Sequence, residues 1–388
     1  MAKVLLTNGL LRKTLAAARS LGKRGVEVYA AETTRTAPAF YSKYVMGGFL
    51  CPDPAREPDA YAEWLERTIR REGIGMLVPM DDAPMDIAVG LRGRLEPFCA
   101  VAAPPEASYR IAADKGLAVP LAERAGVPCP RTAVPQSLEE AERIAREIPY
   151  PAVVKPRRSS GSRGIRVART ADELIAAYRE VHAAHPLPLI QEYIPPGDRY
   201  DVCLLYGTDG ALLASFVQRE VRHFPLPIGP STMQESVARP DLAELALAVM
   251  RPLEWTGVVE IEFMVDPSDG RPKFMEINPR FWNSLHAAIA AGVDFPWLLY
   301  RSLAGEPVEA VHEYETGVRC RNLLPGELLH FLANRDRLRM DPPLWAGAGS
   351  GVVDDVLARD DPGPAWATLL ACARYAVDPG MWRTVFRR

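Results

Sequence analysis

The stretches VVEIEFMV (residues 258–265) and FMEINPR (residues 274–280) decide how this 388-residue chain folds. In both stretches polar and apolar residues alternate, which is typical of β-strands that bury one face. The sequence DPSDG (266–270) between them is rich in turn-forming residues. Together the three stretches predict a β-hairpin whose two strands lie side by side.

Acidic side chains gather on one face of this predicted hairpin. Residues two apart on a strand share a face, so Glu260 and Glu262 lie together, as do Glu276 and Asn278. Like charges in close proximity need a cation to neutralise them, and hard oxygen ligands suit Mg²⁺. We predict a metal site formed by two or three of these carboxylates with the amide oxygen of Asn278, and leave open whether Glu260 joins it. The alternative is a solvated strand face.

A second signal is the loop KPRRSSGSRG (155–164), which lies between the predicted strands 150–156 and 165–168. Small residues let backbone N–H groups approach an anion, and Lys155 adds a positive charge. The loop is not a P-loop, because its lysine precedes the glycines. The alternative is a plain flexible hairpin. Lys115 opens a further predicted helix (111–125), where the alternative is a solvated lysine.

The order of elements predicts an α/β domain followed by α+β domains. Strands and helices alternate in residues 1–107, which indicates an open parallel sheet with crossover helices. Antiparallel strand pairs with flanking helices then fill 108–187 and 188–310. The role of the extension 311–388 stays open.

The first domain carries no dinucleotide-binding fingerprint. Its first turn, TNGLLR (7–12), has one glycine where the fingerprint needs three. Asp81 and Asp82 follow a strand of this domain. They lie either at the edge where open α/β sheets bind ligands, or at the start of a helix as caps.

Composition excludes several classes of protein. The chain is 48% hydrophobic and 24% charged with a net charge of −3, so neither disorder nor binding to nucleic acid is indicated. No apolar run reaches the roughly 18 residues that a membrane span needs. The six cysteines form no CxxC pair, which argues against zinc sites and disulfide frameworks. We expect a cytoplasmic protein with small-molecule partners and no nucleic-acid or membrane partner, and leave a homodimer open.

These features, in this order and spacing, resemble the ATP-grasp superfamily, which includes biotin carboxylase, carbamoyl phosphate synthetase and D-alanine–D-alanine ligase. The resemblance extends over about residues 1–300. It rests on five motifs, which are DK (114–115), VVKP (153–156) with the loop to Gly164, LIQEYI (189–194), IEF (261–263) and EINPR (276–280).

The resemblance implies an ATP-grasp fold, in which antiparallel sheets clasp ATP, and phosphate-binding roles for several residues. Lys115 and Lys155 are expected to hold the phosphates of ATP. Glu262, Glu276 and Asn278 are expected to bind two Mg²⁺ ions, for which Mn²⁺ can substitute. Arg280 and Lys155 are the expected catalytic residues. The expected lid over the phosphates contains Ser159, Ser160, Gly161, Ser162 and Gly164.

The resemblance also implies a hinge that binds the adenine edge through its backbone, with Asp198 on the ribose. The hinge residues are Gln191, Glu192, Tyr193 and Ile194. Three features depart from the family. The lid is SSGSRG (159–164) in place of a run of glycines, Gln191 stands where a glutamate is common, and FWNS (281–284) matches no acceptor signature.

The function that these expectations favour is a ligase that activates a small carboxylic acid as an acyl phosphate and joins it to an amine. The alternatives are a carboxylase-type enzyme that phosphorylates bicarbonate, and a nucleotide-binding regulator without turnover. The resemblance places residues 219–223 near the phosphate end of the site, where surface charge is the alternative interpretation, and a position at a helix start is the alternative for His286. Six residues in all are candidates for binding substrate. They are Arg219, Arg222, His223, Asn283, Ser284 and His286.

Overall fold

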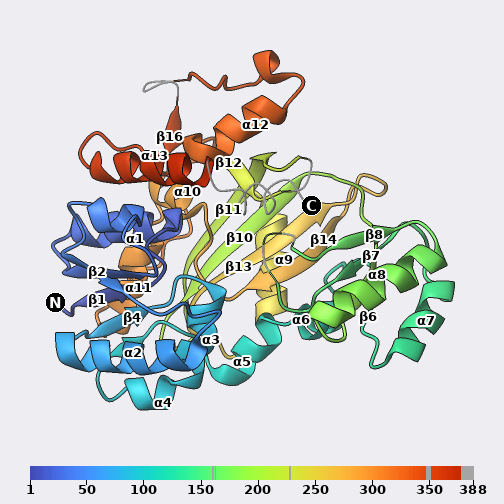
Figure 1. The fold of residues 1–388 in the computed structure, drawn as a ribbon, viewed down its shortest axis with the longest axis horizontal. Coiled ribbons are helices and arrows are strands. Elements are labelled where there is room, and N and C mark those ends of the chain that lie inside the picture. Colours follow the sequence, from blue (N-terminus) through green and yellow to red (C-terminus); the bar gives the residue numbers. More distant parts are fainter. Residues whose placement is uncertain (160, 162, 227–228, 347–350, 377–388) are drawn as a thin grey trace.

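The computed structural model describes residues 1–159, 161, 163–226, 229–346 and 351–376. Three sheets organise the chain (Figure 1). A five-stranded parallel sheet lies at one end, a four-stranded antiparallel sheet lies at the other, and a seven-stranded sheet lies between them. None of the described helices is long and apolar enough to cross a membrane.

The N-terminal sheet has the strand order β3-β2-β1-β4-β5, with all pairs parallel. Its central strands are short apolar runs that are buried on both faces, as the covering helices require. The strands are β1 (Val4–Leu6), β2 (Val28–Glu32), β3 (Gly47–Leu50), β4 (Met76–Val78) and β5 (Ala100–Val101). The helices are α1 (Arg12–Gly22), α2 (Pro58–Glu72), α3 (Asp82–Gly90) and α4 (Arg92–Leu95).

The four-stranded sheet has the order β6-β9-β7-β8 and carries two helices on one face (Figure 1). Helix α7 begins with a capping box, because Ser137 accepts a hydrogen bond from the N–H of Glu140 at 3.2 Å. The strands are β6 (Thr132–Ala133), β7 (Ala152–Lys155), β8 (Arg166–Ala168) and β9 (Leu189–Glu192), and the helices are α7 (Leu138–Glu147) and α8 (Ala171–Ala184).

The central sheet has the order β14-β13-β10-β11-β12-β15-β16. One face packs on α6 and α9 around a core that includes Ile261 and Phe263, and part of the other face packs on the N-terminal domain through Phe216. Its strands are β10 (Arg199–Tyr206), β11 (Leu212–His223), β12 (Ser231–Ser236), β13 (Gly257–Val265), β14 (Pro272–Asn278), β15 (Arg319–Arg321) and β16 (Val352–Asp354). The adjoining helices are α5 (Glu106–Ala112), α6 (Lys115–Arg124), α9 (Pro240–Met250), α10 (Leu285–Ala290) and α11 (Phe295–Leu303).

The helix predicted over 111–125 is wrong in its extent. Two helices, α5 and α6, meet there, and the chain leaves the helical conformation between them. Asp114 caps α6, since its carboxylate accepts a hydrogen bond from the N–H of Gly116 at 2.8 Å. This cap fixes the position of Lys115 as the first residue of α6. The domain boundaries predicted at 107, 187 and 310 remain predictions.

The C-terminal extension closes one edge of the molecule. Strands β15 and β16 continue the central sheet, and α12 (Leu328–Ala333) and α13 (Gly363–Ala376) follow in sequence. Helix α13 packs on the short helix η1 (Pro38–Tyr41) of the N-terminal domain. Asp361 anchors this contact, because its carboxylate binds Arg19 Nε at 2.9 Å and Ser42 Oγ at 2.7 Å.

Candidate active site

A polar row crosses one face of the central sheet. Glu276 on β14 lies directly opposite Glu262 on β13, which lies opposite Asp201 on β10, which lies opposite Gln218 on β11. Directly paired residues of antiparallel strands project from the same face. The apolar residues between them point into the core with α6 and α9. The predicted hairpin therefore delivers its carboxylates to one surface.

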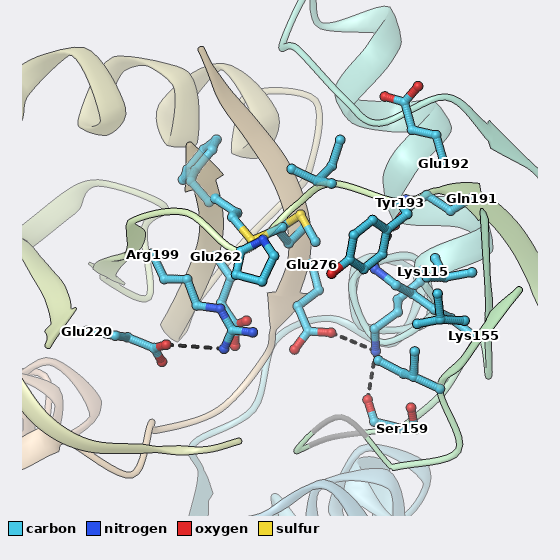
Figure 2. Close-up of a pocket in the computed structure, with 18 of the residues that line it drawn as sticks. Lys115, Lys155, Ser159, Gln191, Glu192, Tyr193, Arg199, Glu220, Glu262 and Glu276 are labelled. Carbon is cyan, nitrogen blue, oxygen red and sulfur yellow. Dashed lines mark hydrogen bonds and ion pairs between the residues drawn. The ribbon is translucent and has the colours of Figure 1, made fainter. Parts of the chain in front are cut away.

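This surface forms one wall of a cavity between the central and the four-stranded sheets (Figure 2). Carboxylates line the central-sheet side, and lysines and the β9 backbone line the other side. Polar lining residues are Lys115, Lys155, Ser159, Gln191, Glu192, Tyr193, Arg199, Asp201, Glu220, Glu262 and Glu276. The cavity also has an apolar lining, which is supplied by Val153, Ile165, Val167, Ile194, Phe263, Met264 and Met275.

The carboxylates of the cavity repel one another. Burial, together with the nearby Glu276 and Glu260, raises the pKa of Glu262 well above its usual range. Burial also raises the pKa of Glu260 to about 7, although the charge of Arg280 opposes this shift. Glu276 differs, because Lys115 holds its pKa below the ordinary value in spite of its burial.

The donor set fits a divalent cation. Asn278 lies among the carboxylates, and its Nδ2 donates to Glu262 Oε1 at 2.7 Å and to Glu260 Oε2 at 3.0 Å. No group of three or more Asp, Glu, His or Cys side chains among the described residues is arranged as a metal cluster. Two carboxylates and an amide would leave the other positions of Mg²⁺ to phosphate oxygens and water. A cation there would relieve the repulsion that raises the pKa of Glu262.

Two lysines face the carboxylates, as Figure 2 shows. Lys115 Nζ lies 2.8 Å from Glu276 Oε2 and 2.7 Å from the carbonyl oxygen of Ser159. Lys155 Nζ donates to Gln191 Oε1 at 2.6 Å. Burial lowers the pKa of Lys155 to about 8. The structure thus brings the two predicted phosphate-binding lysines into one cavity with the predicted metal ligands.

The base of the predicted lid is tied to helix α6. Arg157 makes two bonds to Asp114, at 2.8 and 2.7 Å, and its carbonyl oxygen accepts from the N–H of Lys115. Gly161 has φ +64°, which only glycine adopts at low cost. The predicted lid residues Ser160 and Ser162 lie outside the described residues. Among the other predicted lid residues, Ser159 lines the cavity.

The predicted hinge lies along the cavity, but the predicted ribose residue does not. Residues 191–194 all line the cavity. The side chain of Gln191 is buried, and its Nε2 donates to Thr132 Oγ1 at 2.8 Å. Asp198 is exposed and lies outside the described lining, so its role remains a prediction.

Arg280 is held by residues from the N-terminal domain. Its Nε lies 2.8 Å from Asp82 Oδ1 and 3.7 Å from Asp81 Oδ1, while its Nη2 donates to Asn278 Oδ1 at 3.0 Å. The two aspartates therefore reach the site and supply no side-chain cap to α3. Lys13, which is buried, binds Asp81 at 3.1 Å, and burial lowers its pKa to about 8. The contact of Lys13 with Asp81 was not predicted, because nothing in the residues around this lysine indicates a distant partner.

The predicted substrate residues fall into two groups. Asn283 and Ser284 line a chamber together with Arg280, and this chamber shares Glu262 and Glu276 with the cavity. The others lie outside the described lining of this chamber. Arg219 is paired with Glu235 at 2.7 Å, and Arg222 is buried against Glu327.

Neither histidine among the predicted substrate residues lines the chamber as described. Burial lowers the pKa of His223 to about 4, so this side chain is neutral at pH 7. Burial also lowers the pKa of His286. Both side chains fit packing roles better than the binding of an acid.

The comparisons with known proteins agree with this geometry. The family model of the ATP-grasp domain matches residues 112–284. A D-alanine–D-alanine ligase from Gloeobacter violaceus is 32% identical over 212 residues, which is 49% of this chain and 68% of that protein. Biotin carboxylase 1 from Bacillus subtilis is 30% identical over 156 residues, which is 37% of this chain and 34% of that protein. This chain thus matches about one third of the carboxylase.

A solved structure shares the fold. The biotin carboxylase domain of Hydrogenobacter thermophilus 2-oxoglutarate carboxylase, in complex with MgADP, ADP and bicarbonate, superposes with a TM-score of 0.69. The alignment covers 82% of this chain and 73% of that one at 20% identity. This alignment confirms the predicted fold class. The sequence matches show that the chain belongs to the ATP-grasp family.

Proposed function

We propose that this protein is an ADP-forming ligase, which uses ATP and Mg²⁺ to join a small carboxylic acid to an amine. The observation that carries the proposal is the arrangement of opposite charges in one cavity. Lys115 and Lys155 lie on one side, and Glu262 and Glu276 lie on the other. Phosphoryl transfer depends on positioning and on charge neutralisation, and this arrangement supplies both.

The apolar and the charged parts of the lining favour one orientation of ATP in the cavity. Its adenine would lie against the apolar lining beside residues 191–194, and its phosphates would extend toward Lys115 and Lys155. Glu262, Glu276 and Asn278 would hold Mg²⁺, which would supply neutralisation of phosphate charge when bound. Ser159, Gly161 and Gly164, which are the described residues of the predicted lid, would cover the phosphates and keep water from the acyl phosphate.

Arg280 lies where the cavity opens into the chamber that Asn283 and Ser284 line. A carboxylate oxygen of the acid attacks the γ-phosphorus, ADP leaves, and Arg280 stabilises the charge on the transferred group. The amine then attacks the carbonyl carbon of the acyl phosphate, the bond to phosphate breaks, and an amide forms. Asp82 orients Arg280 for both steps through their 2.8 Å ion pair.

The wider setting is also a proposal. The six cysteines are free thiols, which supports a cytoplasmic location. Small molecules are the partners that the cavity and the chamber fit. Residues 108–187 and 188–310 would act as the two halves that clasp ATP.

Release of ADP against a panel of small acids and amines tests the proposal. Amide product that forms only when ATP, an acid and an amine are all present would support it. Hydroxylamine should trap the acyl phosphate as a hydroxamate. Lys155→Met should abolish both signals, whereas the matched change Lys23→Met at an exposed lysine should leave them intact. Release stimulated by bicarbonate alone would favour a carboxylase-type enzyme, and ATP binding without turnover would favour a regulator.

A further inference from the structure

A second, mainly apolar cavity lies next to the chamber of the candidate active site. Its volume is about 380 Å³. The turn after β1, helix α1, the β11–β12 connection and the C-terminal extension all contribute to its wall. We call it the apolar pocket, and it is defined by Leu11, Leu15, Phe224, Leu329, Val356 and Ala371.

The apolar pocket adjoins the chamber that contains the predicted chemistry. That chamber, of about 450 Å³, is lined by Glu262, Glu276 and Arg280 among others. The two spaces share wall residues, which are Leu11, Arg12, Pro230, Ser231 and Asn283. These shared residues are where a substituent of a molecule that reacts beside Arg280 would enter the apolar pocket.

The apolar pocket does not offer a charge to a ligand. Arg12 is the one charged residue among the described residues that line it. Its guanidinium already binds Asp355, and it donates to the carbonyl oxygen of Ser231 at 2.9 Å. Removal of apolar surface from water is the force that such a wall provides, so the pocket fits an uncharged hydrocarbon group.

A buried acceptor without a partner lies in the wall of the chamber. Gln234 is fully buried on β12, and its Oε1 has no hydrogen-bond partner among the residues that the structure describes. Its Nε2 donates to Ser231 Oγ at 2.5 Å, and the hydroxyl of Ser231 in turn donates to the carbonyl oxygen of Met233. Because Ser231 Oγ already donates to a carbonyl oxygen, it accepts from the amide of Gln234. The atom of the amide that faces Ser231 is therefore the nitrogen Nε2, and the oxygen Oε1 is the atom without a bond. A buried carbonyl oxygen needs an N–H or O–H donor, which an amine supplies.

We infer that the amine substrate carries a bulky apolar substituent, which occupies the apolar pocket while the nitrogen lies near Gln234. This inference rests on the proposed function and names its acceptor class. In the second step the nitrogen forms the C–N bond, the C–O bond to phosphate breaks, inorganic phosphate leaves and the nitrogen releases one proton to solvent. The C-terminal extension, through Leu329 and Ala371, sets the size of the substituent.

Binding of four probes tests the inference without any turnover. Isoamylamine and ethylamine can react only as amines, and 4-methylpentanoate and acetate only as acids. Their affinities are measured by calorimetry with Mg²⁺ and a non-hydrolysable ATP analogue. Isoamylamine should bind at least about tenfold tighter than ethylamine, because three further carbons are buried. Equal affinities of the two amines would overturn the inference.

Substitutions in α12 and α13 test where the amine binds. Ala371→Leu fills the apolar pocket and should remove the preference for isoamylamine. Ala373→Leu adds the same group at an exposed position of the same helix and should leave the preference intact. Leu329→Ala enlarges the pocket and should shift the preference toward phenethylamine, which tests the site even if Ala371→Leu does not fold. A preference confined to 4-methylpentanoate would assign the pocket to the acid and overturn the amine assignment.

The outcomes separate this inference from the proposed function. Binding that depends on Ala371, without amide formation from any acid and amine, would reject the ligase proposal and keep the apolar amine site. Efficient ligation of ethylamine, with no preference for isoamylamine, would reject only the apolar amine site.

Discussion

Lys155 Nζ lies 2.6 Å from the amide oxygen of Gln191, so a predicted phosphate-binding lysine is held by the side chain of a predicted hinge residue. The sequence motif suggested only a backbone role for Gln191. Its buried side chain spans from Lys155 to Thr132, which fixes the ammonium group at the edge of the cavity. Because Gln191 is neutral, it offers no charge to offset the burial of Lys155.

This contact predicts how ATP binding depends on pH. Burial lowers the pKa of Lys155 to about 8, from 10.5 in the unfolded chain. The ammonium form binds phosphate, so the KM for ATP should rise as the pH increases through about 8. Gln191→Glu places a carboxylate beside Lys155, which favours the ammonium form and should move this rise to higher pH. KM measured between pH 6.5 and 9.5 checks this.

Thr132→Val serves as the control for that variant. This variant removes the hydrogen bond between Gln191 and Thr132 without adding charge. The pH at the midpoint of the rise in KM should therefore stay near 8. If the KM for ATP rises at the same pH in Gln191→Glu and in the wild type, Lys155 does not control the pH dependence of KM.

Asn278→Asp tests the metal site through stability. Asn278 Nδ2 donates to carboxylates, and an aspartate there would add a negative charge to the cluster. Without Mg²⁺ the free energy of unfolding should fall by about 1–3 kcal/mol. Millimolar Mg²⁺ should restore it, because a ligand that binds only the folded state stabilises it. Glu262→Gln should show the opposite pattern, with a stable metal-free protein and a weaker response to Mg²⁺ in thermal unfolding.

Glu276→Gln tests the role of the same cluster in turnover. The variant keeps the shape of the side chain but loses the charge that neighbours Lys115. We expect kcat to fall at least about 100-fold, whereas the Kd for ATP changes only a few-fold, since the lost charge matters most in the transition state. Near-native kcat in this variant would remove Glu276 from the metal site.

The sequence predicted those parts of the site that depend on local patterns. Alternation along 258–265 requires one polar and one apolar face wherever the strand lies, so a patch of carboxylates was expected on the hairpin. The direct pairing of Glu262 with Glu276 also depends on the irregularity in register between Glu262 and Phe263, which the alternation does not reveal. The parallel sheet of the first domain followed similarly from short apolar runs between helices. Such features depend on a few neighbouring residues, and the local order of residues in the sequence therefore reveals them.

Contacts between distant segments could not be predicted in the same way. The Arg280–Asp82 pair joins residues 198 positions apart, and it exists only because the N-terminal domain packs against the end of β14. For the same reason Arg222 appeared to be a substrate residue until its partner Glu327, from the C-terminal extension, was known. Strand β12 was missed because its alternation is weak and its pairing with β11 is irregular.

Asp82→Asn tests whether the N-terminal domain positions Arg280. Burial opposes the charge of Arg280, but Asp82 and Asp81 raise its pKa, so the pair stabilises the ionised guanidinium. With the neutral amide we expect kcat to fall about tenfold while the KM for ATP stays constant, because Arg280 would still be charged but less well oriented. Asp59→Asn on the exposed side of α2 is the control. Equal kcat in both variants would make the Arg280–Asp82 pair a packing contact only.

The last prediction concerns the lid. Lys115 donates to the carbonyl oxygen of Ser159, but the described lid residues beyond it, such as Gly161, Arg163 and Gly164, are partly or fully exposed. Backbone with little burial opens easily, so the amides of these residues should exchange rapidly in the free protein. A non-hydrolysable ATP analogue with Mg²⁺ should slow the exchange, because phosphate oxygens give the N–H groups partners in the closed form only.

Gly161→Pro links this exchange to activity. Gly161 has φ +64°, and proline holds φ near −65° and removes an N–H group, so the loop cannot adopt its present backbone. We expect a sharp fall in kcat and no slowing of exchange by nucleotide, with little loss of stability because the segment buries few side chains. Gly210→Pro creates the same conflict in the β10–β11 turn, at φ +78°, and should spare both kcat and lid exchange. Exchange at Ser159–Gly164 that is identical with and without nucleotide would mean that the lid lies elsewhere in the chain.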